Sequence, residues 1–399
     1  MTDQPIQNCG KCGLCLSVCP VYQVLKQEQA SPRARLQLIK AFEKKDLSAS
    51  PLLKDMVSQC LMCGACKAAC PSGINHYAKF MEMRQKMAKS QPDPPAIRSL
   101  IYLLANEYRL RMGAGLARIG RRLTPAALEK KYSIGTIPVS RFPEMNRRPF
   151  RSTLPRVSPA KGTPRSYSKA NPIDHSRGNS RGRVIYFTGC ATNFLFADTG
   201  QATVNILTRL GYEVVIPPSQ TCCGIPMMFH GARDQAVENM AVNLTAIQEA
   251  MRENGGDTKE NAKDAAAENC DAMDKACDEA AKNCDAVIVD CTTCGAALKD
   301  EYPALMNTPA GSRHAALTQK IAPGMPETIA AKTRDILSFL HDHLDDLAAA
   351  MTPDTPKHKV IYHAPCHSKN SFNSLAKVLE LLKALPCFDY IPVPDAAAC

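Results

Sequence analysis

The stretch that decides the fold is CGKCGLCLSVCP at residues 9–20, and it recurs as CLMCGACKAACP at residues 60–71. In both runs two residues separate the first three cysteines, three residues precede the fourth, and a proline follows it. Three cysteines at this spacing wrap around one cuboidal [4Fe–4S] cluster, and the fourth points away towards a neighbouring cluster. Since the whole run occurs twice, the sequence predicts two [4Fe–4S] clusters.

Each expected ligand set takes three cysteines from one run and the fourth from the other. The sets are Cys9, Cys12, Cys15 and Cys70 for the first cluster, and Cys60, Cys63, Cys66 and Cys19 for the second. Zinc is the alternative, but zinc sites usually show two paired Cys-x2-Cys elements with a longer gap between them. The duplicated run therefore favours iron–sulfur clusters over zinc.

The segment between the runs is expected to be helical. Ser31 can cap a helix, Pro32 suits its first turn, and apolar residues follow at helical spacing. With forty residues between Cys19 and Cys60, this region resembles the all-helical dicluster ferredoxin domains of respiratory iron–sulfur subunits. We place this domain at residues 1–88.

The chain of 399 residues carries 19 cysteines, an odd number, and eight of them lie in the first 70 residues. The N-terminus has no signal-peptide pattern, and no apolar run reaches the 18 residues of a membrane-spanning helix. The expected location is the cytoplasm, where reduced thiols serve as metal ligands more readily than as disulfides.

The net charge of +11 has its source in one segment. Between Arg109 and Arg183 there are 14 Arg and 4 Lys against three acidic residues. Residues 97–123 are expected to form one helix with an apolar and an Arg-rich face, and residues 136–182 an extended or disordered linker. We expect the segment 97–183 to bind an anionic surface, either a membrane or an acidic partner, with a solvated linker as the alternative. Nucleic acid is not expected, because aromatic residues are not interleaved with the charges.

From Arg183 onward the pattern changes to α/β. Strands are expected at 184–187, 213–216 and 285–290, with a helix at 199–210, which predicts a parallel sheet. Residues 252–284 are of low complexity and carry Cys270, Cys277 and Cys284. We expect them to form a surface helical insertion and not a further metal site.

A second cysteine group consists of a lone Cys, a Cys-Cys-Gly and a Cys-x2-Cys: Cys190, Cys222, Cys223, Cys291 and Cys294. It resembles the cysteine-rich (CCG) domain, over 183–350 and, in part, over 358–399. In the heterodisulfide reductase of that family these five cysteines hold a non-cubane [4Fe–4S] cluster, and the resemblance implies the same here. Adjacent cysteines cannot both bind an ordinary cube without strain, which agrees with another cluster shape.

The region 358–399 repeats the first CCG unit. In the first unit 32 positions separate Cys190 from Cys222, and 33 separate Cys366 from Cys399 in the second. Cys366 and Cys399 are thus candidate ligands of an incomplete second unit. We expect the recorded C-terminus to be a truncation, either because the sequence is a fragment or because a selenocysteine codon after Cys399 was read as a stop.

Two stretches resemble the iron–sulfur subunits of glycolate oxidase and D-lactate dehydrogenase: Pro32-Arg33-x-Arg35 and CTTCGAALKDEYP at 291–303. The resemblance implies an α+β multidomain chain, with the dicluster domain at 1–88, a basic helix and linker at 89–182, and CCG domains at 183–350 and 358–399. It implies an electron-transfer subunit of an oxidoreductase complex that has no catalytic residue of its own.

The sequence shows no nucleotide-binding fingerprint. We therefore expect the hydride of a 2-hydroxy acid to be taken by an FAD-containing partner subunit. This chain then passes electrons to a quinone or another carrier, with peripheral contact at the inner membrane face. The alternative is a thiol–disulfide oxidoreductase of the heterodisulfide reductase type, with its chemistry at the Cys-Cys-Gly cluster.

Overall fold

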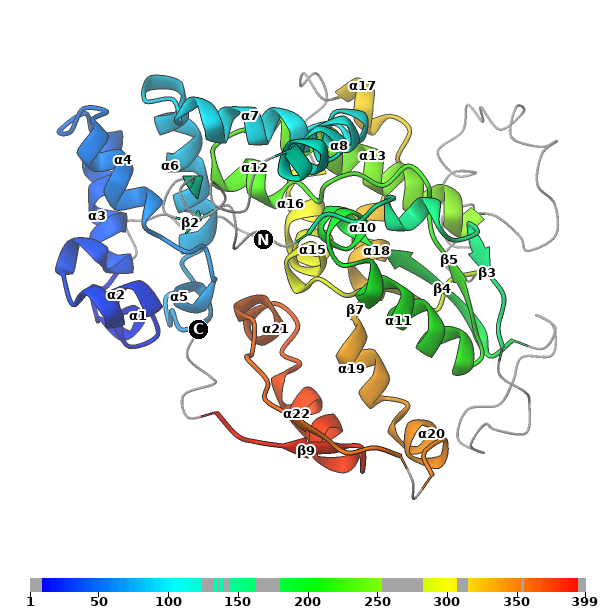
Figure 1. Cartoon of the computed structure of the whole chain (residues 1–399). Coiled ribbons are helices and arrows are strands. Elements are labelled where there is room, and N and C mark those ends of the chain that lie inside the picture. Colours follow the sequence, from blue (N-terminus) through cyan, green and yellow to red (C-terminus); the bar gives the residue numbers. More distant parts are fainter. Residues whose placement is uncertain are drawn as a thin grey trace. The chain divides into compact units, whose positions relative to one another are not determined.

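The computed structural model describes residues 9–123, 133–134, 137–138, 144–161, 180–252, 283–306, 315–352 and 355–393 (Figure 1). The chain divides into two compact units, each assembled from separate stretches of sequence. The first unit comprises Met1–Ile101, Gly224–Ala236 and Leu337–Cys399, and the second comprises Tyr102–Cys223 and Val237–Ile336. The expected α+β multidomain class is confirmed, while the domain boundaries stay a proposal.

Helices are the regular elements in the described part of the first 101 residues. They are α1 (Leu14–Ser17), α2 (Pro20–Leu25), η2 (Glu28–Ala30), α3 (Pro32–Glu43), α4 (Pro51–Ser58), α5 (Ala65–Ala68), α6 (His76–Ser90) and the start of α7 (Pro95–Leu104). Proline opens α2, α3 and α4, where its fixed φ suits the first turn and its missing N–H costs nothing. The predicted cap of α3 is confirmed, because the Ser31 hydroxyl accepts a hydrogen bond from the Ala34 N–H at 3.1 Å.

The two cysteine runs repeat each other in backbone conformation as well as in sequence. Gly13 and Gly64, at equivalent positions, have φ of 85° and 78°, in the region where glycine carries no steric penalty. Lys11 and Met62 also correspond, and both have a φ of 54°, which is uncommon for residues with a side chain. Each run thus turns in the same way before its short helix, α1 or α5.

The apolar faces of α3, α4 and α6 form the core of this region. Leu36 and Ile39 of α3, Val57 of α4, and Phe80 and Met83 of α6 are at most 1% exposed. Burying one such side chain stabilises the fold by about 1.5–3 kcal/mol relative to leaving it exposed. This core holds the two cysteine runs together.

The rest of the first unit contains a second, smaller strand–helix–strand motif. The elements of this part of the unit are α12 (Ile225–Phe229), the start of α13 (Arg233–Arg252), α19 (Ile336–His341), α20 (Leu344–Ala349), β8 (His358–Val360), α21 (Cys366–Asn370), α22 (Leu375–Ala384) and β9 (Phe388–Tyr390). The motif runs from β8 through α21 and α22 to β9. Strands β8 and β9 pair in parallel, with Lys359 opposite Asp389. The predicted strand–helix–strand repeat is therefore present, and Cys399 lies outside the described residues.

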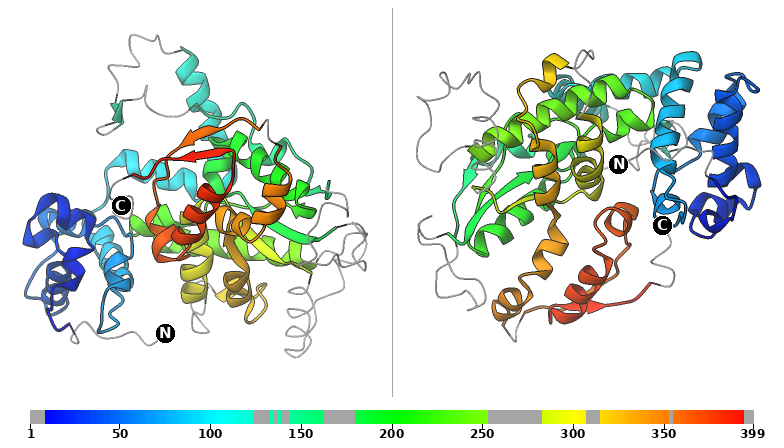
Figure 2. Two further views of the ribbon diagram at one scale, coloured as in Figure 1. Left: turned by 90° about the horizontal axis from the view of Figure 1, so that it is seen from below. Right: turned by 180° about the vertical axis from the view of Figure 1, so that it is seen from behind.

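A five-stranded mixed sheet forms the centre of the second unit (Figures 1 and 2). Its strands, in spatial order, are β3 (Val157–Ser158), β5 (Tyr212–Val215), β4 (Gly182–Phe187), β6 (Ala286–Val289) and β7 (Thr333–Asp335). All neighbours pair in parallel except β3, which runs antiparallel to β5. Every residue of β4 and β6 is buried, as the continuous apolar sequence of a central parallel strand requires.

Helices connect these strands, and the predicted strands and helix of this region are confirmed to within a few residues. The remaining elements of the unit are α8 (Glu107–Leu123), β1 (Ser133–Ile134), β2 (Ile137–Pro138), η4 (Phe150–Ser152), α10 (Gly189–Phe194), α11 (Ala197–Arg209), α15 (Thr292–Ala296), the π-helical η7 (Ala297–Glu301), α16 (Tyr302–Met306), α17 (Ala315–Thr318) and α18 (Met325–Lys332).

Two expectations about the basic segment are wrong. Residues 97–123 form two helices, α7 and α8, because the chain breaks at Asn106, whose side-chain oxygen accepts the Arg109 N–H at 3.2 Å and caps α8. Residues 144–161, expected to be an extended or disordered linker, are ordered. Phe150 is 1% exposed and meets Tyr186 edge to face, and Val157 pairs with Val215 of the sheet.

The low-complexity stretch is described only at its end. Cys270 and Cys277 lie outside the described residues. Cys284 is 1% exposed, and its thiol donates to the Ala286 carbonyl at 3.3 Å, so it belongs to the core beside β6 and not to a surface helix. Within the described ranges, no helix combines the length and the apolar character needed to cross a membrane.

Candidate metal centres

The first expected ligand set lines a single cavity. Cys9, Cys12 and Cys15 come from the first run, and Cys70 comes from the end of the second. Lys11 and Arg33 line the same cavity. The structure therefore brings together four cysteines that are separated by up to 61 positions in sequence.

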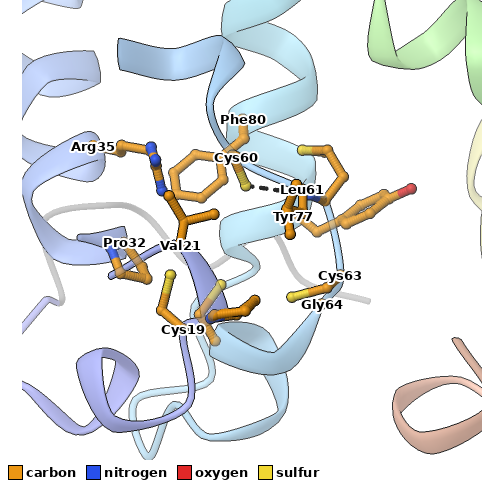
Figure 3. A pocket seen from close by; sticks show the side chains of 13 residues that line it. Cys19, Val21, Pro32, Arg35, Cys60, Leu61, Cys63, Gly64, Tyr77 and Phe80 are labelled. Carbon is orange, nitrogen blue, oxygen red and sulfur yellow. Dashed lines mark hydrogen bonds between the residues drawn. The ribbon is translucent and has the colours of Figure 1, made fainter. Parts of the chain in front are cut away.

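The second expected set lines another cavity of similar size. Cys60, Cys63 and Cys66 come from the second run and Cys19 from the first. Figure 3 shows Cys19, Cys60 and Cys63 around this space, with Arg35 and Phe80 in its wall. Each cavity thus collects three cysteines of one run and the last cysteine of the other, as crossed ligation requires.

Burial disfavours free thiolates in the second cavity. Desolvation raises the pKa of both Cys60 and Cys66, and the neighbouring thiols raise that of Cys66 further. Iron binds the thiolate form. A cavity of buried thiols therefore needs nearby positive charge, which a metal centre and buried cations can supply.

Arg35 supplies one buried cation. Its side chain is 0% exposed, and its Nε donates to the Met56 carbonyl at 2.9 Å. Its other two nitrogens, Nη1 and Nη2, are buried without a hydrogen-bond partner among the described residues. Burying such donors unpaired costs roughly 1–3 kcal/mol or more for a charged group. Their position in the wall of the second cavity shows that this cavity suits an anionic occupant.

Arg84 of α6 holds the loop that begins the second run. Its Nη2 donates to the carbonyl oxygens of Ser58 at 2.9 Å and Cys60 at 2.6 Å, and its side chain is largely buried. Its charge lowers the pKa of Cys60, against the larger effect of burial. A [4Fe–4S] centre with four thiolate ligands is negatively charged, so the unpaired donors of Arg35 and the position of Arg84 fit such a centre.

The third cysteine group lies at one edge of the sheet in the second unit. Cys190 follows the end of β4, Cys222 and Cys223 follow β5, and Cys291 follows β6. These three strands are neighbours and parallel, so their carboxyl ends meet at the same edge. This edge is the usual place for a binding site in an open parallel sheet.

The five thiols of this group form one hydrogen-bonded chain. Hydrogen bonds between the free thiols link Cys190 to Cys222, Cys222 to Cys223, Cys223 to Cys294, and Cys294 to Cys291. Hydrogen bonds from the neighbouring thiols lower the pKa of Cys223 to about 6, and one from Cys294 lowers that of Cys291 to about 6. The same hydrogen bonds raise the pKa of Cys190 and Cys294 well above the ordinary value, because these thiols share their protons with the sulfurs that carry the charge. Five adjoining sulfurs linked in this way suit a metal cluster.

The Cys222–Cys223 backbone is held by polar side chains of α13 and α16. The amides of Asn239 and Asn243 both donate to the Cys222 carbonyl at 3.2 Å, and the Tyr302 hydroxyl donates to the Cys223 carbonyl at 3.3 Å. Asn243 also donates to Tyr302 at 2.9 Å, which links these supports. The adjacent cysteines are therefore fixed by second-layer contacts of the kind that orient metal ligands.

Close packing against the Cys294 sulfur explains why position 189, next to Cys190, is a glycine. Gly189 has a φ of 62°, and a Cβ there would lie 2.7 Å from the Cys294 sulfur. Any larger residue would clash with this sulfur and would strain the backbone at this positive φ.

The structure describes one of the two candidate ligands of the second CCG unit, so this pair stays a prediction. Cys366 is half-buried at the start of α21, while Cys399 lies outside the described residues. Across the described ranges, no three His, Cys, Asp or Glu side chains form a group that could hold a single metal ion. The cysteines instead surround the cavities and the sheet edge described above.

Sequence reasoning missed the supporting residues: Arg35, Arg84, Asn239, Asn243 and Tyr302. Arg35 was visible as part of Pro32-Arg33-x-Arg35, but its burial was not. A sequence signal is present for both arginines: Ile39 lies four positions after Arg35, and Phe80 and Met87 lie four before and three after Arg84, at the spacing of a core-facing stripe.

Comparison with known proteins agrees with both cysteine groups. Residues 5–74 match the model of the 4Fe-4S dicluster domain, and residues 184–257 match that of the cysteine-rich (CCG) domain. A dicluster domain houses two [4Fe–4S] clusters, so the expectation of two such clusters is confirmed at the level of the domain. The CCG domain supports a further iron–sulfur cluster, while the individual ligands stay a proposal.

Several curated proteins are similar to this chain along its whole length. It is 27% identical to the probable glycolate oxidase iron-sulfur subunit of Bacillus subtilis, covering 79% of that protein, and 24% identical to the glycolate oxidase iron-sulfur subunit of Escherichia coli, again covering 79%. It is also 25% identical to a subunit of the anaerobic glycerol-3-phosphate dehydrogenase of Escherichia coli, and it covers 83% of that subunit. No solved structure matches the chain.

Crossed ligation can be tested with single serine substitutions. Cys19→Ser is expected to change the electron paramagnetic resonance signal that Cys63→Ser changes, because both residues line the second cavity. Cys70→Ser is expected to change the signal that Cys12→Ser changes. If Cys19→Ser instead altered the signal affected by Cys12→Ser, each run would serve its own cluster.

The charge of Arg35 is expected to raise the reduction potential of the second cluster, because a buried cation stabilises the more negative, reduced state. Arg35→Gln should lower that potential by roughly 50–100 mV in an anaerobic redox titration. The matched control is Lys44→Gln at the end of α3, since Lys44 is exposed and lines neither cluster cavity. Equal shifts in both variants would contradict the assigned role of Arg35.

Gly189→Ala is expected to block the cluster of the CCG domain, because the added methyl meets the Cys294 sulfur. Iron analysis of anaerobically reconstituted protein should show the loss of one cluster's iron, with the signals of the two ferredoxin-type clusters unchanged. Gly115→Ala is the control, since a Cβ there meets nothing within 4 Å. Full iron content in Gly189→Ala would show that this close approach has no part in cluster binding.

Proposed function

We propose that this chain is an iron–sulfur protein of the glycolate oxidase subunit type. In that role it transfers electrons within a flavin-dependent 2-hydroxy-acid dehydrogenase complex. The substrate of that complex would be glycolate or D-lactate. The chain would receive electrons from an FAD-containing partner subunit and pass them to a quinone or another carrier. One observation carries the proposal: two cavities, each lined by four cysteines drawn from both runs, together with five cysteines at one edge of a sheet.

The proposed ligands are Cys9, Cys12, Cys15 and Cys70 for the first cluster, Cys19, Cys60, Cys63 and Cys66 for the second, and Cys190, Cys222, Cys223, Cys291 and Cys294 for the cluster of the CCG domain. Bound clusters supply one-electron transfer, which neither thiols nor amides perform alone. The chain's own part is to hold thiolates in position, to shield the second site from water, and to balance its charge with Arg35 and Arg84.

Crossed ligation gives the relay a structural basis. Because Cys19 ends the first run and lines the second cavity, a single short helix, α1, connects the two sites. Cys70 makes the equivalent connection through α5. Sites joined by such short segments are held near each other, as rapid electron exchange requires.

A flavoprotein partner follows from the division of chemistry. A 2-hydroxy acid gives up two electrons as a hydride, whereas iron–sulfur clusters accept them one at a time. A flavin can take a hydride and release single electrons, so it has to stand between the substrate and this chain. The sequence contains no Gly-x-Gly-x-x-Gly fingerprint for such a cofactor, which is why we assign the flavin to a partner subunit.

The proposal is tested by purifying the chain anaerobically from cells that express it at its natural level, with an affinity tag. We expect an FAD-containing protein to copurify, and glycolate or D-lactate to bleach the visible absorbance of the clusters. The chain alone should be bleached by dithionite and not by either acid. Cys63→Ser, which lacks a ligand of the second cluster, is expected to slow the passage of electrons to an added quinone.

Other outcomes would contradict the proposal. A complex that contains flavin but is not reduced by any 2-hydroxy acid would remove the assigned substrate class. Cluster oxidation by a disulfide substrate, with no response to quinone, would favour the thiol–disulfide alternative, in which the chemistry takes place at the Cys-Cys-Gly cysteines.

A further inference from the structure

Helix α8, labelled in Figure 1, has large apolar side chains that are exposed to solvent along one face. Tyr108, Met112, Leu116 and Ile119 are 71%, 50%, 65% and 57% exposed. They follow each other at intervals of four, four and three residues, so they share one face of the helix over three turns. Single exposed apolar residues are ordinary on a protein surface, but a continuous stripe of four large ones marks a contact surface.

The opposite face of α8 is already packed. Ala114 is 6% exposed, and a Cβ on Gly113 would lie 3.1 Å from the Leu103 side chain, which shows how closely the helix approaches the end of α7. The stripe is therefore not needed to attach the helix to its own unit. It is a second apolar face that the fold leaves uncovered.

Positive charge borders the stripe on both sides. Helical geometry places Arg111 and Arg118 along one border and Arg109 along the other. The Arg109 guanidinium lies 4.0 Å from the centre of the Tyr102 ring, and Tyr102 is itself 59% exposed.

The acidic residue of the helix is turned away from this surface. Glu107 accepts hydrogen bonds from Arg151 at 2.5 Å and from Asn193 at 3.0 Å, both within the second unit. No other acid occurs between Glu107 and Leu123. Arg111 is close enough to Glu107 to interact with its charge, and Arg118 donates to the Arg147 carbonyl, a neutral partner. The exposed side of α8 thus combines large apolar side chains with an excess of positive charge.

We propose that α8 lies flat in the surface of an anionic lipid bilayer. The stripe would enter the boundary between headgroups and acyl chains, and Arg109, Arg111 and Arg118 would meet lipid phosphates. This is the geometry of an interfacial helix, which combines apolar insertion with attraction to anionic lipid. Charge complementarity selects an anionic surface, and the stripe, in which Tyr108 at one end is the single side chain with a hydroxyl, selects lipid over an acidic protein.

The first test is vesicle flotation of the anaerobically purified holoprotein at low salt. Vesicles of phosphatidylcholine with phosphatidylglycerol are expected to carry the protein, and pure phosphatidylcholine is expected to carry much less. The paired substitution Leu116→Gln with Ile119→Gln should lower partitioning roughly tenfold or more, because it removes the inserted aliphatic groups. Arg111→Gln with Arg118→Gln should lower it by about tenfold, with weaker salt dependence. Leu52→Gln on α4, 65% exposed and outside the stripe, is the matched control and should float like the wild type.

A second test uses the absence of tryptophan from the chain. Tyr108→Trp introduces a single indole into the stripe, whose fluorescence should shift to the blue with anionic vesicles and be quenched by brominated acyl chains. Leu52→Trp should show neither response. Both variants are first compared with the wild type in iron content and visible absorbance, so that folding failure is separated from loss of binding.

Three outcomes would overturn the proposal. The first is that the wild type does not float at low salt, and the second is that the Leu116→Gln, Ile119→Gln variant floats as well as the wild type. The third is that, without lipid, the wild type is a dimer and this variant is a monomer. The last result would assign the stripe to a contact between two copies of the chain.

Discussion

The rest of the structure depends on one constraint, the sharing of cysteines between the two runs. Cys19 and Cys70 each leave their own run and enter the cavity of the other. Neither site can form unless the 40 residues between the runs fold back and bring both together. The proline-started helices α3 and α4 and the core of Leu36, Ile39 and Phe80 perform that task. Helix packing and metal binding are therefore one folding problem in this region, as in other proteins in which the metal site exists only in the folded state.

The cysteine group of the second unit solves the same problem with a sheet. Three parallel strands end at one edge, and each delivers cysteines there. The positions of the sulfurs follow from strand register, since Ile185 lies opposite both Val215 and Val287. Asn239, Asn243 and Tyr302 then hold the turn that carries Cys222 and Cys223, which lies beyond the end of β5.

Much of this could be predicted from the sequence, because spacing carries the information. The cysteine runs predicted two clusters, and the alternation after Arg183 predicted the parallel strands. The break at Asn106 was missed because the apolar and basic pattern continues across it, and only the cap distinguishes two helices from one. The segment 144–161 has the Pro-, Ser- and Arg-rich composition of a linker, with little periodicity. Its order depends on distant partners, such as Tyr186 for Phe150 and Glu107 for Arg151.

The sheet order has a consequence for how the protein is made. Strand β4 is completed by residue 187, but its neighbour β6 begins only at residue 286. At roughly 5–20 residues per second, a ribosome needs about 5–20 s to synthesise the sequence between them. During that time first Cys190 and then Cys222 and Cys223 are added to a nascent chain that still has no Cys291 or Cys294. The dicluster region, in contrast, has all eight of its cysteines after 70 residues. The cysteine group at the sheet edge is therefore the last to be assembled and the longest exposed to oxidation during biosynthesis.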